Sequence, residues 1–595
     1  MPNRNIDVIE TGRECAIGRA TPETALPSVR NAPATLAEAV VQIFAELGAR
    51  YAFGVSGGAM AALWHALSKS AVAVRHFRHE SGAAFAAVEA HFASDRPVVV
   101  FTTTGPGLTN ALTGLLAARG EGAKVIVLSA ATTAAQRGRW AIQETGGRSM
   151  PADLYTAGAL FHFATLLESA DELPAVGRRL AHGLSRPGGF VAHLAIPTGL
   201  QSGEWRGPLP DLSIGRGEEA PTDETIARCA RLLSDGPFAI WLGFGARKAS
   251  ALVRRLAERM GAAVICSPRA KGVFPEDHPQ FVGVTGLGGH GSTITYMTEG
   301  RPRRVLVLGT RLGEPTSFWN PVMVPPDGFI HVDVDPEVPG VAYPSAPTFA
   351  VRADVGVFLA ALLDHLPERA PAVVRFPRPE RLQIGPAVAG AVQPEALMAA
   401  IQQVVIDRHR AIVLAESGNS FTWASHCLRF DEAGRYRVST GVGSMGHAGA
   451  GVVGAALGCS GKAVAILGDG AMLMNNEVNT AVKFELPAVW IVLNDARYNM
   501  CEQGMATLGL SADASIPEVD FAMLARALGA EGLRVEGEAE LVPALERAMA
   551  ASGPFVLDVR IDPTRRAPSQ GRNRGLRAQI ADAGPHHEVS FPRTA

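Results

Sequence analysis

The chain of 595 residues lacks the compositional marks of several large classes of protein. Only 19% of its residues are charged and its formal net charge is −2, so it has no basic excess of the kind that binds nucleic acid or anionic membranes. No apolar run reaches the ~18 residues expected of a membrane span. Hydrophobic residues make up 47% of the chain, which is typical of a globular protein with a large core. At ~150 residues per domain, we expect three or four domains.

Cysteines are few and scattered. The six are Cys15, Cys229, Cys266, Cys427, Cys459 and Cys501. Because none forms a CxxC pair, the sequence indicates neither a zinc site nor a disulfide framework, and we expect a cytoplasmic protein. Residues 1–32 are polar, contain proline and acidic residues and have no apolar signal core. We therefore expect a disordered leader there rather than an export signal.

Two short apolar runs that each end in a polar turn lie toward the C-terminus. The run "AVAILGDG" ends around Asp469, and "PAVWIVLND" ends at Asp495, with a helix-length segment between them. A right-handed crossover would bring the ends of two such parallel strands to one edge of a sheet, where ligands bind. Two carboxylates and the backbone carbonyl of Arg497 suit a magnesium ion that leaves positions for phosphate oxygens. Taken alone, the GDG tripeptide also fits an aspartate that caps a helix.

This unit, taken together with a segment nearly 400 residues upstream, resembles the thiamine-diphosphate enzymes of the acetolactate-synthase-like family. The upstream segment, residues 51–119, is similar to the family's pyrimidine-binding domain, and "RHESGAAFAA" places Glu80 at its activating glutamate. The resemblance implies thiamine diphosphate and Mg²⁺ as cofactors, with Asp469, Asp495 and Arg497 on the cation. The other cofactor-binding residues that it implies are Gly443, Ser444, Met445, Gly468, Gly470, Ala471, Tyr498, Asn499 and Met500.

In that family the glutamate starts the chemistry. A carboxyl group hydrogen-bonded to the aminopyrimidine favours its imino tautomer, which can take the proton from the thiazolium carbon. The alternative for Glu80 is an acid that interacts with a helix dipole. Met445, in "GSMG", corresponds to the residue beneath the bent cofactor, although a core methionine would look the same. The GxGxxG spelled by Gly441, Gly443 and Gly446 is a weak dinucleotide signal, because the next acid is Asp469.

Two further polar residues are candidates for catalysis. Gln143 in "AIQETGG" matches the glutamine of the family's FQE-type motif, and His447 follows Met445. Either side chain is able to hydrogen-bond a carboxylate or a developing alkoxide. For a single histidine, however, a structural role is the more common one.

The alternation of strands and helices predicts an α/β protein with three doubly wound parallel-sheet domains. We place the pyrimidine-binding domain at 33–200, the central domain at 221–366 and the diphosphate-binding domain at 390–563, followed by an Arg-rich tail at 564–595. The tail is either disordered or folded over the active site. The family resemblance implies a homodimer or homotetramer in which each active site is shared between subunits.

Residues in the same predicted domain as Glu80 limit the choice of reaction. Simple 2-oxo acid decarboxylases carry an adjacent His-His pair in this domain, and "LSAATTAAQRGRWAIQETGG" contains no histidine. Ser81 stands where biosynthetic acetolactate synthases usually have glutamine. Segments such as "RGRWAIQET", "GNSFTWASH" and "LNDARYNMCEQGM" resemble the acyloin synthases of scytonemin biosynthesis, a pathway of secondary metabolism. That likeness implies a carboligase that decarboxylates an aromatic 2-oxo acid such as indolepyruvate and couples it to a second carbonyl.

Several alternatives stay open at this point. The chain may be read as an acetolactate synthase acting on pyruvate, or as a simple decarboxylase. A flavin-binding acetolactate synthase would hold FAD in its central domain, but "GTRLGEPTSFWN" carries no convincing fingerprint for it. A non-enzymatic relative is disfavoured, because Glu80, Asp469 and Asp495 have little reason to persist together without the cofactor.

Overall fold

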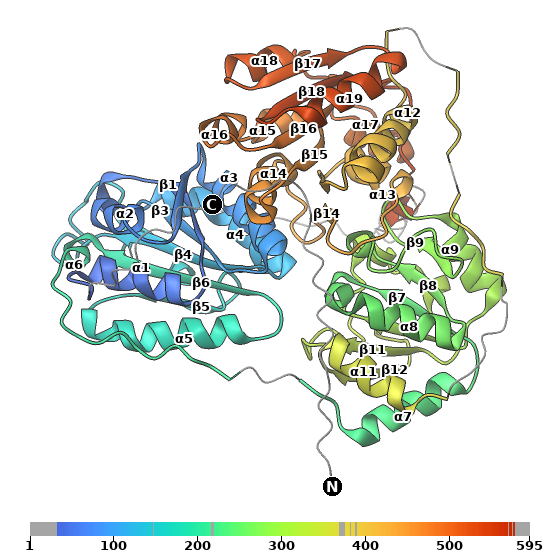
Figure 1. Ribbon diagram of the computed structural model, residues 1–595, viewed down its shortest axis with the longest axis horizontal. Helices are drawn as coiled ribbons and strands as arrows, with labels where there is room; N and C mark the ends of the chain where they lie inside the picture. The colour runs from blue at the N-terminus through green and yellow to red at the C-terminus, as the bar shows by residue number, and fades with distance from the viewer. Residues whose placement is uncertain are drawn as a thin grey trace, which may run out of the picture. The chain divides into compact units, whose positions relative to one another are not determined.

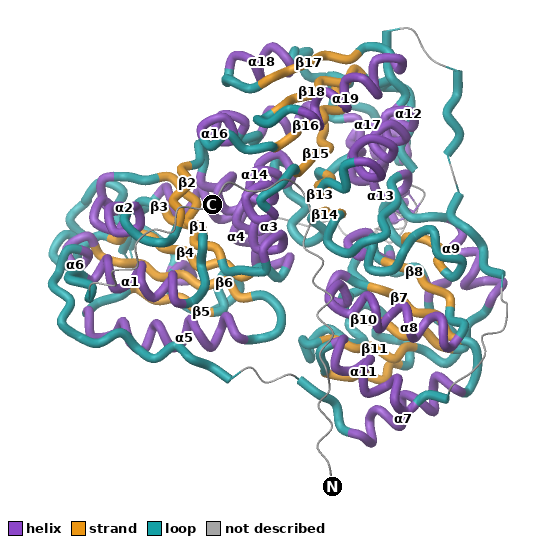
Figure 2. Tube along the Cα trace, viewed as in Figure 1, coloured by secondary structure: helices purple, strands orange, loops and turns teal. Residues whose placement is uncertain are grey.

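A computed structural model describes residues 32–146, 148–215, 219–367, 375–380, 382–386, 390–568, 571–573 and 575–577. The leader expected at 1–32, apart from its last residue, and the end of the tail lie outside this part of the chain. The described residues form three six-stranded sheets in which every neighbouring pair of strands is parallel (Figures 1 and 2). The prediction of three parallel-sheet α/β domains is therefore confirmed. None of the described helices is long and apolar enough to cross a membrane.

The first sheet has the strand order β2-β1-β3-β4-β6-β5. Its strands are β1 (Tyr51–Val55), β2 (Ala73–His76), β3 (Val98–Thr102), β4 (Lys124–Ala131), β5 (Phe163–Leu166) and β6 (Phe190–Pro197). Its helices are α1 (Leu36–Glu46), α2 (Ala61–Ser68), α3 (Glu80–Ser94), α4 (Pro106–Glu121), α5 (Leu173–Ser185) and α6 (Thr198–Gln201). The central strand β3, "VVVFT", is buried along its whole length, as expected of a strand covered on both faces.

The second sheet has the order β12-β11-β10-β7-β8-β9. From β7 the chain first adds strands on one side, and from β10 it adds them on the other, while β7 and β10 pair in parallel. Its strands are β7 (Phe238–Leu242), β8 (Ala263–Cys266), β9 (Phe281–Val284), β10 (Arg304–Leu308), β11 (Phe329–Asp333) and β12 (Thr348–Arg352). Its helices are α7 (Asp223–Ser234), α8 (Ser250–Met260), α9 (Gly291–Thr295), α10 (Glu314–Ser317) and α11 (Val355–His365). The loops after β7 and β10 meet directly, because the amide of Gly245 donates to the carbonyl oxygen of Gly309 at 3.0 Å.

The third sheet has the order β14-β13-β15-β16-β18-β17. Its strands are β13 (Ile412–Ala415), β14 (Tyr436–Val438), β15 (Ala463–Gly468), β16 (Ala488–Asn494), β17 (Glu531–Val535) and β18 (Phe555–Arg560). Its helices are α12 (Pro394–Ile401), α13 (Asn419–Cys427), α14 (His447–Cys459), α15 (Asp469–Met474), α16 (Val478–Lys483), α17 (Asn499–Thr507), α18 (Phe521–Ala527) and α19 (Leu541–Ala550). Strand β16, "AVWIVLN", is fully buried.

Helices α3 and α14 join the first and third domains. Small residues allow the two backbones to approach closely: a Cβ added at Gly454 would lie 1.9 Å from the carbonyl oxygen of Ala86. Near the end of α14, a Cβ at Gly458 would lie 2.7 Å from the carbonyl oxygen of Ala90. One apolar core includes buried residues of both domains, among them Val88 and Val452. This contact links the helix that begins at Glu80 to the helix that follows Gly443, Ser444 and Met445.

Candidate cofactor site

The two aspartates predicted to bind a cation follow neighbouring strands of the third sheet. Strands β15 and β16 pair in parallel up to Gly468 and Leu493, so both chains leave the sheet at the same edge. Asp469 begins α15 and is only 3% exposed. Its Oδ1 accepts a hydrogen bond from the amide of Gly470 at 2.7 Å, whereas its Oδ2 is buried with no hydrogen-bond partner among the described residues. A buried carboxylate oxygen without a partner is costly, and a bound cation would satisfy it.

The electrostatics of the two carboxyl groups also favour a cation between them. Burial raises the pKa of Asp469, and the hydrogen bond from the amide of Gly470 opposes this rise. Burial raises the pKa of Asp495 to about 7; a hydrogen bond from Asn499 opposes the shift, and the charge of Asp469 adds to it. Two buried acids that repel each other would both ionise readily beside a divalent cation.

The number of protein ligands also suits Mg²⁺ with a diphosphate. Among the described residues no group of three or more His, Cys, Asp or Glu side chains is arranged to hold a metal. Asp469, Asp495 and, as predicted from the sequence, the Arg497 carbonyl would hold the cation and leave the remaining positions to phosphate oxygens and water. The Arg497 carbonyl stays a prediction. The guanidinium of Arg497 forms an ion pair with Glu502 at 3.1 Å.

The loop after β16 is held by one contact within itself and one contact with the GDG turn that contains Asp469, here called the cation loop. Asn499 Nδ2 donates to Asp495 Oδ2 at 2.6 Å, which fixes the direction of that carboxylate. The ring of Tyr498 rests on the backbone of Gly470, where an added Cβ would lie 2.6 Å from a ring carbon. A side chain at Gly470 would therefore force the ring of Tyr498, which is 44% exposed, to shift. The carbonyl oxygen of Met500 accepts a hydrogen bond from Arg572 at 3.4 Å, so part of the C-terminal tail lies against α17.

The segment that contains Met445 is held by a buried acid that the sequence analysis missed. Glu416, 1% exposed, follows β13, and its Oε2 accepts hydrogen bonds from the amides of Gly446, Ala448 and Gly449 at 3.0, 2.9 and 3.2 Å. These are orphan amides at the start of α14. Met445 itself is partly buried against the shared core, as expected for either of the roles considered for it. The only signal for Glu416 was an acid at the end of the apolar run "AIVLAE".

Glu80 and Gln143 both contact the segment that follows β3. Glu80 begins α3, is 7% exposed, and its Oε2 accepts a hydrogen bond from Asn110 Nδ2 at 3.2 Å. Gln143, in the loop after β4, accepts a hydrogen bond from Thr104 Oγ1 at 3.2 Å and packs on Gly105. The turn that follows β3 thus joins the two candidates, because Gly107 in the same turn lies beside Glu80 Oε1.

His447 occupies a different environment. It begins α14 and is 3% exposed, and its Nε2 is 2.9 Å from Glu89 Oε1 of α3. Glu89 also pairs with Arg437 at 3.0 Å. Burial opposes ionisation of both partners, yet the charges of Arg437 and His447 lower the pKa of Glu89 to about 2, and Glu89 raises the pKa of His447. One ring nitrogen is therefore committed to an ion pair between domains. A catalytic role for His447 stays a prediction that depends on Nδ1, which is buried without a partner among the described residues.

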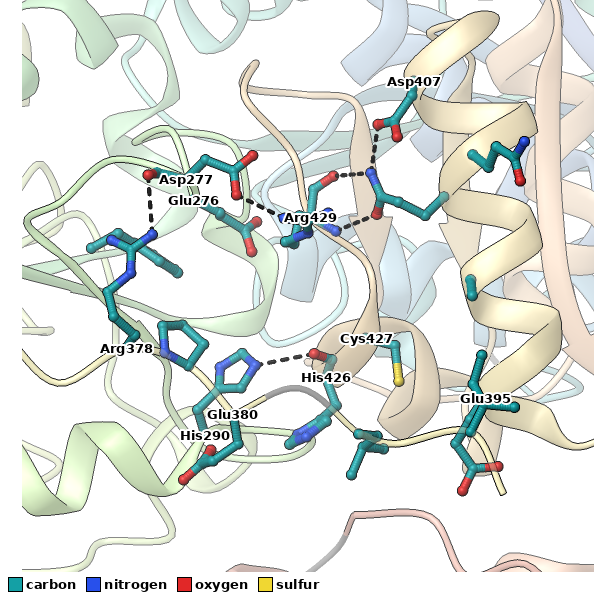
Figure 3. A pocket seen from close by; sticks show the side chains of 17 residues that line it. Glu276, Asp277, His290, Arg378, Glu380, Glu395, Asp407, His426, Cys427 and Arg429 are labelled. Atoms are coloured by element: carbon teal, nitrogen blue, oxygen red, sulfur yellow. Dashed lines mark hydrogen bonds and ion pairs between the residues drawn. The ribbon is translucent and has the colours of Figure 1, made fainter. Parts of the chain in front are cut away.

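A separate cavity of about 460 Å³ lies between the second and third domains (Figure 3). His426 lines it, and His290 Nε2 donates to the carbonyl oxygen of His426 at 3.0 Å. Neither Glu80 nor Asp469 contributes to its wall. The third-domain residue His426 therefore borders this cavity, apart from the residues that would hold the cofactor.

The fold and the paired carboxylates at a strand edge define an α/β enzyme built to hold a cofactor. Three sequence profiles of the thiamine pyrophosphate enzymes match the chain: the N-terminal TPP binding domain at residues 34–150, the central domain at 227–362 and the C-terminal TPP binding domain at 416–559. Together these matches span more than half of the chain. The protein belongs to the thiamine pyrophosphate enzymes.

Its relatives narrow the family further. The acetolactate synthase of Mycobacterium bovis is 27% identical over 559 residues, which cover 88% of this chain and 87% of the relative. The acetolactate synthase isozyme 1 large subunit of Escherichia coli is 27% identical over 553 residues, covering 89% and 94%. An X-ray structure titled as a thiamin diphosphate-dependent enzyme from Mycobacterium smegmatis aligns with a TM-score of 0.75 at 21% identity, covering 89% and 99%, and supports the same fold. The chain is thus a thiamine pyrophosphate enzyme that is similar to the acetolactate synthases.

Proposed function

We propose that the protein is a thiamine-diphosphate- and Mg²⁺-dependent carboligase. It decarboxylates an aromatic 2-oxo acid, indolepyruvate being the leading candidate, and couples the remaining acyl unit to a second 2-oxo acid or related carbonyl to give an acyloin. When bound, thiamine diphosphate supplies a nucleophilic carbon and stabilises the negative charge that decarboxylation leaves behind. FAD is not required by this proposal, and a cytoplasmic location stays a prediction.

The chain's own residues divide the work between two sheet edges. Asp469, Asp495 and the Arg497 carbonyl hold the cation and through it the diphosphate. Glu80 shares a proton with the pyrimidine ring, and its direction is set by Asn110. Gln143 is held by Thr104 beside Glu80 and presents an amide that can bind a substrate carboxylate or a developing alkoxide.

The observation that carries the proposal is the loop after β4, between residues 132 and 146. It contains Gln143, which contacts Thr104, and two large apolar side chains, Trp140 and Ile142, which are 96% and 91% exposed. Glu144 stiffens the loop by accepting hydrogen bonds from the amides of Gly138 and Ala141 at 2.6 and 3.2 Å. The loop has no histidine to deliver the proton that an aldehyde product requires, and its apolar tip favours a bulky partner.

The same loop supports an assembly in which the active site is shared. Trp140 and Ile142 would be largely desolvated if a second copy brought its diphosphate domain onto this edge. We therefore include a homodimer, or a homotetramer of two dimers, in the proposal. Pyruvate self-condensation is the second candidate, because the acetolactate synthases cover nearly the whole chain.

The test is a product analysis with purified protein, thiamine diphosphate and magnesium. Indolepyruvate, hydroxyphenylpyruvate and pyruvate are supplied singly and in pairs, and the products are identified by mass spectrometry. We expect a coupled product from an aromatic donor. Acetolactate from pyruvate alone would favour the second candidate, and an aldehyde alone would make the protein a decarboxylase.

A further inference from the structure

A buried acid of the third domain, Glu477, accepts hydrogen bonds from the backbone just before Glu80. Glu477 lies eight positions after Asp469, between α15 and α16, and is 4% exposed. Its Oε2 accepts a hydrogen bond from the amide of Arg78 at 3.0 Å, and its Oε1 accepts one from the amide of His79 at 3.0 Å. The hydroxyl of Thr480 also donates to it. Neither sequence pattern nor the cation site accounts for this carboxylate.

The backbone at Glu477 is held in an uncommon conformation. Its φ is +53°, in the left-handed region that side chains other than glycine rarely adopt. Such strain persists only where surrounding contacts impose it, and it is concentrated at functional sites. Here the conformation lets the side chain leave the third domain and reach the first.

The receiving surface is shaped for this carboxylate. Gly82, in the first turn of α3, leaves the required space, since an added Cβ would lie 2.4 Å from Glu477 Oε1. Two neighbouring contacts reinforce the grip: Asn475 Nδ2 donates to Ser81 Oγ at 3.1 Å, and Arg78 Nε donates to Asn479 at 2.7 Å. Three residues that follow the cation loop therefore hold the residues on both sides of Glu80.

We propose that Glu477 is a positioning residue for Glu80. By accepting the amides of Arg78 and His79, it sets the entry of the chain into α3 and hence the direction of the Glu80 carboxyl. The inference rests on the proposed function in one respect, the proton-sharing role of Glu80. In a dimer with shared sites, Glu80 and Asp469 of one chain belong to different active sites. The hydrogen bonds of Glu477 would then connect the chain segment of the activating acid in one site to the cation loop of the other site.

The first test uses the full chain without cofactor. Amide hydrogen exchange, followed by mass spectrometry of peptides that cover residues 77–82, is compared for Glu477→Ala, Glu477→Gln and the natural protein. We expect exchange of the Arg78 and His79 amides to be faster by about tenfold or more in Glu477→Ala, because both amides lose their hydrogen-bond acceptor. Glu477→Gln keeps one acceptor oxygen and should fall between. Glu485→Gln, an exposed acid in the same segment, is the matched control and should leave these amides unchanged.

The second test reads the consequence at the cofactor. With thiamine diphosphate and Mg²⁺, we expect cofactor affinity in Glu477→Gln to stay within about threefold, because the cation ligands are intact, while exchange of the thiazolium proton slows by about tenfold. kcat should fall with KM nearly unchanged. If Glu477→Ala does not fold, Glu477→Gln alone still decides the matter.

Two outcomes would overturn the inference: unchanged protection of the Arg78 and His79 amides in the variants, or normal thiazolium proton exchange despite lost protection. The substrate proposal fails separately. If no 2-oxo acid is coupled, yet both exchange measurements change as expected, the substrate assignment is wrong and the role of Glu477 stands.

Discussion

The first and third sheets have the same strand order but place their acids at different strand ends. In each, the second strand in sequence lies at the edge, beside the first, and the third and fourth follow on the other side. In the first sheet Glu80 follows the second strand. In the third sheet Asp469 follows the third strand and Asp495 the fourth. The same strand order therefore carries acidic residues at different strand ends, because the loops, and not the sheet, determine which side chains are presented there.

The equivalent helices make the likeness more specific. α3 and α14 each follow the second strand of their sheet, and these two helices pack against each other through Gly454 and Ala86. Each begins with a buried side chain that can exchange a proton, Glu80 in one and His447 in the other. Glu80 accepts a hydrogen bond from the side-chain amide of Asn110, whereas His447 forms an ion pair with an acid of the facing helix. The same helix start therefore carries the predicted activating acid in one domain and an interdomain ion pair in the other.

Glu80→Gln should have the largest effect. Turnover is expected to fall by about 10²–10⁴, because the amide cannot share a proton with the pyrimidine ring. Thiamine diphosphate affinity, measured by quenching of tryptophan fluorescence, should change by only a few fold. Glu46→Gln, at the exposed end of α1, is the control. Normal turnover in Glu80→Gln would show that Glu80 is not the activating acid, and that the two sheet edges do not have the separate roles proposed here.

Asp469→Asn tests the other edge and should show the opposite pattern. Loss of a direct cation ligand is expected to weaken magnesium-dependent cofactor binding by at least about 100-fold, since even outer-shell partners of a metal contribute 10–100-fold. Calorimetric titration of thiamine diphosphate at several magnesium concentrations measures this. Asp513→Asn, in an exposed turn, should bind normally. Cofactor binding independent of magnesium in Asp469→Asn would contradict the assignment.

Glu89→Gln probes the ion pair between α3 and α14. It should lower the free energy of unfolding by about 3–5 kcal/mol near pH 7, because Arg437 and His447 lose their buried partner. The pKa of Glu89 is about 2 in the folded protein against an ordinary value of 4.5, so its stabilising contribution is complete above pH 4.5 and is lost as the pH falls toward 2.

Urea unfolding between pH 3 and 8 checks this expectation. The difference between the natural protein and Glu89→Gln should be largest between about pH 5 and 6.5. It should narrow below pH 4.5 as Glu89 takes up a proton, and above pH 6.5 as the pH rises through the raised pKa of His447. A difference that grows as the pH falls below 4.5 would show that the ion pair does not stabilise the domain contact.

Gly454→Ala should have the smallest of these effects. Alanine normally stabilises a helix relative to glycine, but here its methyl group would meet the Ala86 carbonyl oxygen at 1.9 Å and force α14 away from α3. We expect a loss of about 1–3 kcal/mol in the free energy of unfolding. Gly553→Ala, where no atom lies within 4 Å, should show no loss. An unchanged Gly454→Ala would mean that the close contact of the helices is not needed for stability.

Much of the architecture could be predicted from local sequence. Fully apolar runs such as those of β3 and β16, separated by helix-length segments, indicate parallel sheets because both faces of such strands must be covered. The sequence also indicates that the GDG turn and the Asn-Asp turn are neighbours, because a right-handed crossover brings the ends of the two strands to the same edge of the sheet. Asp469 and Asp495 are close in the structure for that reason. The functional roles of Glu80, Gln143 and His447 stay predictions. In the structure Glu80 and His447 begin helices, and Gln143 lies in the loop after β4.

What the sequence could not show is which distant acid holds which loop. Glu416, Glu477 and Glu89 are ordinary glutamates in the sequence, and each becomes informative only because folding buries it against amides or charges from far along the chain. Local pattern thus determined the class of fold, the cofactor motifs and the two sheet edges, since these depend on residue spacing and strand handedness. Tertiary structure alone decided the partners of the buried acids, because a desolvated carboxylate must be satisfied by whatever the packed domains bring within hydrogen-bond distance.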